Sequence, residues 1–91
     1  MAAELFRGIA AESGRLDSLI APATEHWRME RLAVVDRNIL RIAVYELVHD
    51  RVPARVAIDE ALWLAHRFGG VQTPAFVNGV LDPVARTLGR L

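Results

Sequence analysis

Hydrophobic residues recur at helical spacing along most of the chain, and this pattern predicts four helices and no strand. The first helix is expected over residues 3–21, where apolar side chains lie four or seven positions apart and Pro22 ends the segment. The second is expected over residues 34–49, which are apolar on nearly every side, as is typical of a central buried helix. Residues 23–33 between them are predicted to form a linker held on the core by Trp27, Met29 and Leu32.

An amphipathic stripe predicts the third helix, over residues 55–68. Its apolar positions follow the helical period and are Ile58, Ala61, Leu62, Ala65 and Phe68. Gly69 and Gly70 supply a C-terminal stop. Asp59 and Glu60, in the first turn, are expected to complement the positive end of the helix dipole rather than to act as a catalytic carboxylate pair.

The fourth helix has the strongest start signal in the chain. Thr73 is a favourable N-cap residue, and Pro74 suits the first helical position. Pro83 is expected to kink this helix or to divide it after Leu81, because proline lacks the N–H that the helix needs. Gly79 is expected to allow close packing of another helix. Together the four segments predict an all-α fold, a small helical bundle.

Length and composition indicate a single domain over residues 1–91. The chain is 53% hydrophobic and 24% charged, which fits a compact globule and excludes an intrinsically disordered chain. The sequence contains no cysteine, and this excludes disulfides, thiolate nucleophiles and cysteine-based zinc sites. No apolar run approaches the ~18 residues of a membrane span, and no signal peptide is evident, so a cytoplasmic location is expected.

Arginine supplies all 11 basic residues, yet the formal net charge is zero. A free-standing nucleic-acid-binding domain usually carries a basic excess, so any RNA contact here needs a local patch or a partner. Arg37 and Arg41 lie four residues apart on one helix face, where like charges repel. We expect an acidic neighbour such as Asp36, or an external anion such as an RNA phosphate, to balance them.

Residues with catalytic or metal-binding potential do not form a recognisable pattern. Ser13 and Ser18 have no histidine close in sequence, and the glycines do not match a phosphate-binding loop. Glu46 and His49 have the spacing of one half of a di-iron site, but the sequence has no second Glu-x-x-His. These observations predict a protein that is not an enzyme and holds neither a metal nor a cofactor.

Four blocks of sequence resemble the NusB family of transcription antitermination factors. They are LAVVDRNILR (residues 32–41), IAVYEL (42–47), a block from VAIDEA to RFG (56–69) and FVNGVLD (76–82). The resemblance implies an all-helical, non-enzymatic protein that binds boxA-type ribosomal RNA leaders together with the ribosomal protein NusE, in the antitermination that supports ribosomal RNA synthesis. Family members normally begin with two further helices and an Arg-rich RNA-binding segment, so RNA binding by this chain is expected to be weak or partner-dependent.

The resemblance also implies where contacts are made. Asp36 and Arg37 match the acidic–basic pair that opens the family's central helix near the NusE face. Phe76 matches an aromatic near the partner and RNA surface, although a plain core role is an equal alternative, and Asn78 belongs to the same block. RNA contacts are therefore expected from Arg37, Arg41 and Phe76, and partner contacts from Asp36, Arg37, Phe76 and Asn78.

Trp63 departs from the family pattern, because it lies off the apolar stripe where family members often carry a charge. An outward Trp63 either stacks on Arg67, four residues further on, or anchors an interface. In family members, some helices pack on the two further N-terminal helices. The matching helices of this chain would then expose apolar surface. A homo-oligomer is therefore expected, formed through Trp63 and, on the first helix, Leu5 and Ile9.

Two other interpretations remain open from the sequence. Some ribosomal RNA cytosine methyltransferases carry a NusB-like accessory domain, so the chain is compatible with a fragment of such an enzyme. It is also compatible with a self-associating structural fragment that has no RNA activity.

Overall fold

The computed structural model describes residues 2–24, 33–49 and 52–91, and for residues 2–6 and 23–24 it describes the backbone alone. These parts contain five α-helices and one 3₁₀-helix, with no strand. In chain order they are α1 (Ala2–Ala11), α2 (Ser13–Ile20), η1 (Ala21–Thr24), α3 (Val34–His49), α4 (Ala54–Phe68) and α5 (Thr73–Thr87). The predicted all-α bundle is confirmed. The predicted contacts of Trp27, Met29 and Leu32 fall outside the described residues.

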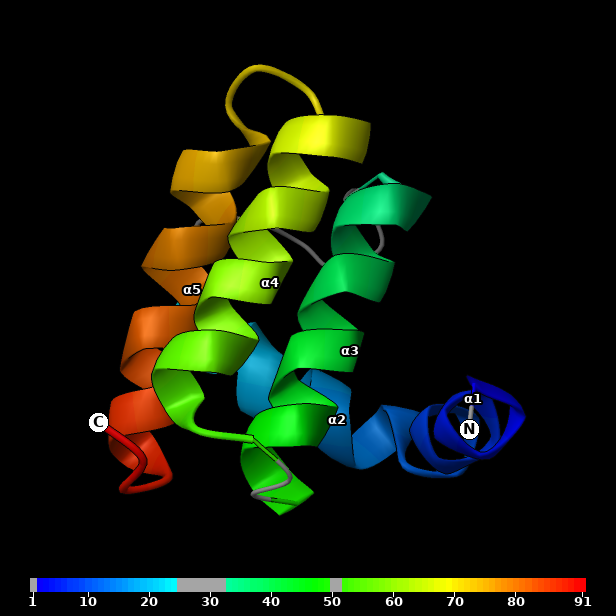
Figure 1. Cartoon of the computed structure of the whole chain (residues 1–91). Helices are drawn as coiled ribbons and strands as arrows, with labels where there is room; N and C mark the ends of the chain where they lie inside the picture. The colour runs from blue at the N-terminus through cyan, green and yellow to red at the C-terminus, as the bar shows by residue number, and fades with distance from the viewer. Residues whose placement is uncertain (1, 25–32, 50–51) are drawn as a thin grey trace.

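Three long helices form the body of the molecule. α3, α4 and α5 stand side by side with alternating direction, and α1 and α2 lie across one end of them (Figure 1). α3 is the central helix, because it contacts α1, α2, α4 and α5. Its buried side chains are Ile39, Leu40, Ala43, Val44, Tyr45 and Leu47. The predicted bounds of this helix and its central, buried position are both confirmed. None of the described helices combines the length and the apolar character that crossing a bilayer requires.

The prediction of one continuous first helix is wrong, because the chain turns at Glu12 between α1 and α2. Glu12 leaves the helical conformation, with φ −107° and ψ 11°. The turn brings α1 against α3, where Gly8 lies so close to Tyr45 that a Cβ would overlap the hydroxyl oxygen and lie 2.8 Å from Cζ. Apolar periodicity within residues 3–21 carries no sign of this tertiary contact.

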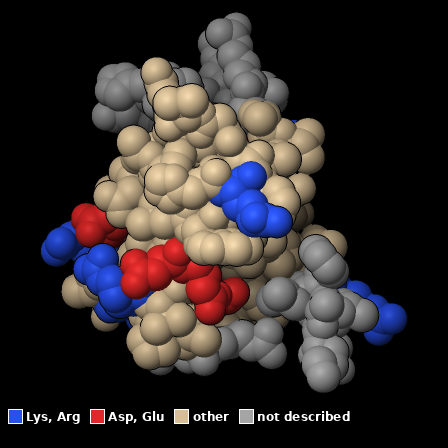
Figure 2. All heavy atoms as spheres, turned by 45° about the horizontal axis from the view of Figure 1, so that its top comes forward, with Lys and Arg blue, Asp and Glu red and all other residues tan. Residues whose placement is uncertain are grey.

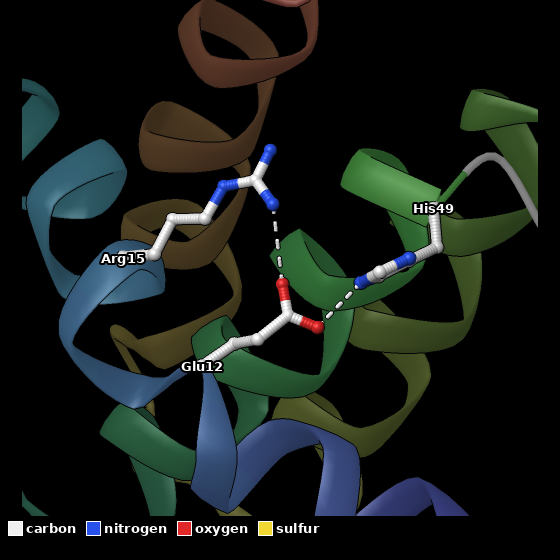
Figure 3. A network of polar contacts seen from close by, with 3 residues as sticks. All are labelled: Glu12, Arg15 and His49. Carbon is white, nitrogen blue, oxygen red and sulfur yellow. Dashed lines mark hydrogen bonds and ion pairs between the residues drawn. The ribbon is translucent and has the colours of Figure 1, made fainter.

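Polar contacts made by Glu12 join the turn to the end of α3. Its carboxylate lies 2.7 Å from Nε2 of His49 and accepts a 3.3 Å hydrogen bond from Arg15 Nη1 (Figure 3). The His49 ring in turn packs against the Tyr45 ring at an interplanar angle of 43°, with ring centroids 4.3 Å apart. Glu12 thus connects α1, α2 and α3 at one point.

The connection from α4 to α5 differs from its predicted form. α4 ends at Phe68 as predicted, but Gln72 is the N-cap of α5, and Thr73 is already helical. The Thr73 hydroxyl accepts a 2.9 Å hydrogen bond from the Gly70 N–H and donates one of 3.2 Å to Asp36 Oδ1. Thr73 therefore joins two helices instead of capping one, and its side chain is buried.

Two further expectations, for Phe68 and Gly79, are wrong, and for Pro83 one of the two expected outcomes is excluded. Phe68 is 59% exposed although it lies only about 20° round the helix from the buried Ala61 at 100° per residue, because it is the last residue of α4 and lies at the end of the bundle. A Cβ added at Gly79 would meet no atom within 4 Å, so no other described part of the chain packs closely on this glycine. α5 is not divided at Pro83 but runs through it, with that residue on the exposed side of the helix.

Candidate interface for RNA and a partner protein

The N-termini of α3 and α5 meet at the end of the bundle that is uppermost in Figure 1. Asp36 lies in the first turn of α3 and is held by the hydroxyl of Thr73, the first residue of α5. Arg37 follows Asp36, and Phe76 lies one turn into α5. The fold therefore places three of the predicted contact residues, Asp36, Arg37 and Phe76, at one end of the molecule.

Arg37 and Arg41 differ in how their charges are balanced. Arg41 makes two hydrogen bonds with Asp17 of α2, from Nε to Oδ1 at 2.8 Å and from Nη2 to Oδ2 at 2.6 Å. An acidic side chain balances Arg41 as expected, but it is Asp17 of α2 and not Asp36, which accepts a hydrogen bond from Thr73 instead. Arg37 is half-buried, and its side chain has no hydrogen bond or ion pair with the described part of the chain.

The Asp17 hydrogen bonds are also the main reason why the pKa of Arg41 is raised above its ordinary value. The guanidinium stays charged at any pH at which the protein is folded. Since both carboxylate oxygens face the same guanidinium, the fork of Arg41 is largely occupied within the molecule. Of the two arginines, Arg37 is the one whose charge is available to an external anion.

Phe76 and Asn78 point to different sides of α5. Phe76 is half-buried and packs against the hydrophobic core. Asn78 is exposed and lies about 200° further round the helix at 100° per residue. The structure therefore brings Phe76, but not the side chain of Asn78, toward the end where Asp36 lies.

Exposed apolar side chains surround this end of the bundle. Figure 2, in which the same end comes forward, shows a broad uncharged area with one isolated basic side chain on it, while most of the other charged side chains in view gather along its lower edge. The large exposed apolar residues at the start of α3, at the end of α4 and in the turn to α5 are Val34, Val35, Phe68 and Val71. An apolar surface beside an arginine whose side chain has no partner in the described part of the chain is compatible with binding both a protein surface and a separate anion.

The residues predicted for self-association fall in different environments. Trp63 is 60% exposed on α4, and the Arg67 guanidinium lies 5.7 Å from its ring centroid, which confirms the predicted stacking. Phe68 meets the same ring edge-on at 6.4 Å. Ile9 is buried in the core, and the side chain of Leu5 lies outside the described residues.

Two residues that organise this region were not singled out as site residues from the sequence. Asp17 and Thr73 each hold a side chain of α3 from another helix. No local signal marks Asp17, since its partner lies 24 positions away. Within the described parts of the chain, no three His, Asp or Glu side chains gather as metal ligands would.

Comparison with known proteins identifies relatives of this arrangement. A family model described as the NusB family matches residues 1–86. The transcription antitermination protein NusB of Solibacter usitatus is 51% identical over 85 residues, which cover 93% of this chain and 58% of that protein. The NusB of Anaeromyxobacter sp. is 50% identical over 82 residues, covering 90% of this chain and 57% of that protein.

A solved structure of T. maritima NusB has the same fold. It superposes with a TM-score of 0.87 at 44% identity, over 91% of this chain and 59% of that one. The chain thus spans a little under three fifths of the length of these relatives. Taken with the all-helical bundle and the family match over residues 1–86, these likenesses show that the chain belongs to the NusB family.

Proposed function

We propose that this chain is a cytoplasmic binding module, not an enzyme, which contacts a boxA-type ribosomal RNA leader together with the ribosomal protein NusE. Its relatives are named transcription antitermination proteins, which supports antitermination over the methyltransferase-fragment alternative. The observation that carries the proposal is the end of the bundle where Asp36 is fixed by Thr73 while the adjacent Arg37 stays uncommitted. A fixed carboxylate beside an available guanidinium is a polar recognition surface rather than a reaction centre.

Each residue of this end has a distinct role in the proposal. Arg37 supplies the positive charge for an RNA phosphate, which a guanidinium can bind through two N–H groups. Asp36 and the exposed face of Phe76 meet the protein partner, with Asn78 at the margin on the other side of α5. Arg41 acts indirectly, because its bond to Asp17 holds α2 on α3 and so supports the position of the preceding turn.

Dependence on a partner follows from the charge balance. Eleven arginines are matched by eleven acidic residues, and Arg15, Arg41 and Arg86 are paired with carboxylates inside the molecule. Because phosphate contacts supply most of the affinity of non-specific RNA binding, a formal net charge of zero implies weak binding by the chain alone. NusE would add surface and charge that this chain lacks.

A titration of labelled boxA RNA, with and without NusE, tests the proposal by fluorescence anisotropy at several salt concentrations. The affinity is expected to rise when NusE is present. Arg37→Ala should weaken that complex and make the slope of log K against log salt shallower by about 0.7, the value for one phosphate contact to single-stranded RNA. Arg7→Ala removes the same charge from an exposed position on α1 and is the matched control.

Three results would contradict the proposal. Absence of RNA binding at low salt under both conditions favours the structural-fragment alternative. Equal losses for Arg37→Ala and Arg7→Ala mean that total charge, and not the end of α3, determines binding. Tight RNA binding with the same affinity in the presence and absence of NusE would contradict the dependence on a partner.

A further inference from the structure

The outer face of α4 is exposed although it carries a large aromatic residue. The helix packs on its neighbours through small side chains and one isoleucine, which are Ala54, Ala57, Ile58, Ala61 and Ala65. On the opposite side Val56 and Trp63, two helical turns apart, are 41% and 60% exposed. Figure 1 shows α4 in front of α3 and α5, so no described helix covers this face.

Acidic and basic side chains on this face are arranged symmetrically about Trp63. Asp59 and Glu60 stand four and three residues before it, and His66 and Arg67 stand three and four residues after it. All four are exposed, and none has a carboxylate–cation partner in the described part of the chain. Arg67 instead lies over the rings of Trp63 and Phe68.

We propose that a second copy of this chain packs antiparallel on this face, with the two-fold axis at Trp63. In that arrangement Arg67 of each copy lies opposite Asp59 of the other, and His66 lies opposite Glu60. The two Trp63 rings meet at the centre, as aromatic anchors do in many interfaces. The surface is therefore self-complementary, which a symmetric dimer requires.

The same charges cannot pair within one chain. Asp59 and Arg67 are eight residues apart, which is about 12 Å along a helix at 1.5 Å per residue. Their mutual attraction is available only when a second helix runs in the opposite direction. RNA is a poorer occupant of this face, because Asp59 and Glu60 would repel its phosphates.

The face of this dimer contains none of Asp36, Arg37 and Phe76 of the proposed RNA and NusE interface, although Phe68 lies at the border of both surfaces. One helix face makes a small interface compared with a stable complex, which buries about 1,600 Å² in total. The dimer is therefore expected to form in the micromolar range and to weaken as salt screens its ion pairs.

Reversed charges provide the decisive experiment, with sedimentation equilibrium of the full chain from low to high micromolar concentration as the measurement. Arg67→Glu alone places two acidic pairs opposite each other in the dimer, and Asp59→Arg alone places two basic pairs opposite each other. Each variant should raise the dimer dissociation constant about tenfold, as two repulsive contacts of roughly 0.7 kcal/mol would. An equimolar mixture of the two variants should dimerise again, because every contact between unlike chains is then attractive.

The mixture also controls for misfolding of the variants, because only folded chains can dimerise again. Arg7→Glu, which makes the same charge change on α1, should leave the dissociation constant unchanged, and Trp63→Ala should raise it. If the unmodified chain stays monomeric at high micromolar concentration, the proposal is wrong, and a different protein is then the expected occupant of this face. A mixture that stays as dissociated as its components, while the unmodified chain dimerises, overturns the antiparallel geometry at Trp63.

Discussion

Two glycines in the N-terminal helices should respond to the same substitution with opposite signs. In α1, a Cβ at Gly8 would overlap the hydroxyl oxygen of Tyr45 and lie 2.8 Å from Cζ and 3.0 Å from Cε2. The Tyr45 ring cannot easily move away, because it is buried and packs against the His49 ring. In α2, a Cβ at Gly14 would meet no atom within 4 Å.

The expected magnitudes follow from these surroundings. Overpacking a core costs about 1–3 kcal/mol, and alanine recovers up to about 1 kcal/mol of helix propensity, so Gly8→Ala should lose about 1–2 kcal/mol of unfolding free energy. Gly14→Ala keeps only the gain and should stabilise the protein by about 0.5–1 kcal/mol. For a domain of this size each kcal/mol shifts Tm by roughly 4–8 °C, so the two variants should separate clearly.

Urea and thermal unfolding followed by circular dichroism at 222 nm measure both effects. In a Tyr45→Phe background, which lacks the overlapping oxygen, the cost of Gly8→Ala should be smaller than in the unmodified chain. If Gly8→Ala stabilises the protein as Gly14→Ala does, α1 is not seated on Tyr45, and the argument from close approach fails.

Two other experiments test the contacts that hold α3. Asp17→Asn and Arg41→Met, combined in a double-mutant cycle, should give a coupling energy of about 1 kcal/mol, the upper end of the range for exposed pairs. We expect this value because the pair is bidentate and its side chains are only 32% and 24% exposed. A coupling energy near zero would show that the pair does not contribute to stability. Gly69→Ala should destabilise the protein by about 1–3 kcal/mol, because a Cβ there would lie 2.6 Å from Cβ of Thr73. It should also shift the NMR signals of Asp36 through the displaced hydroxyl, and unchanged signals would contradict the described junction.

Helices were predictable from the sequence where the hydrophobic pattern alone determines them. The bounds of α3 follow from an apolar segment with polar flanks, and those of α4 follow from its amphipathic stripe and the glycines after Phe68. The break at Glu12 was not predictable, because the apolar spacing continues across it and its cause lies in Tyr45 and His49 of another helix.

The candidate interface was predictable in its residue types but not in its pairings. A need to balance Arg37 and Arg41 is visible in their spacing, yet the partner of Arg41 is Asp17, which no local rule selects among the carboxylates. Thr73 is a residue type that favours the N-cap position, but its hydroxyl donates a hydrogen bond to Asp36 because the ends of α3 and α5 meet in space. Partner choice is a tertiary property, whereas helix period is a local one.

The turn at Glu12 has a consequence for local opening of the native state. In the described part of the chain, α1 contacts the other helices through Gly8 and Ile9, and Glu12 adds a contact just beyond the end of α1. α3 is enclosed by four neighbours. The amide hydrogens of α1 should therefore exchange with solvent through local opening of this helix alone. Exchange of the α3 amide hydrogens requires opening of the whole bundle, so it should be much slower.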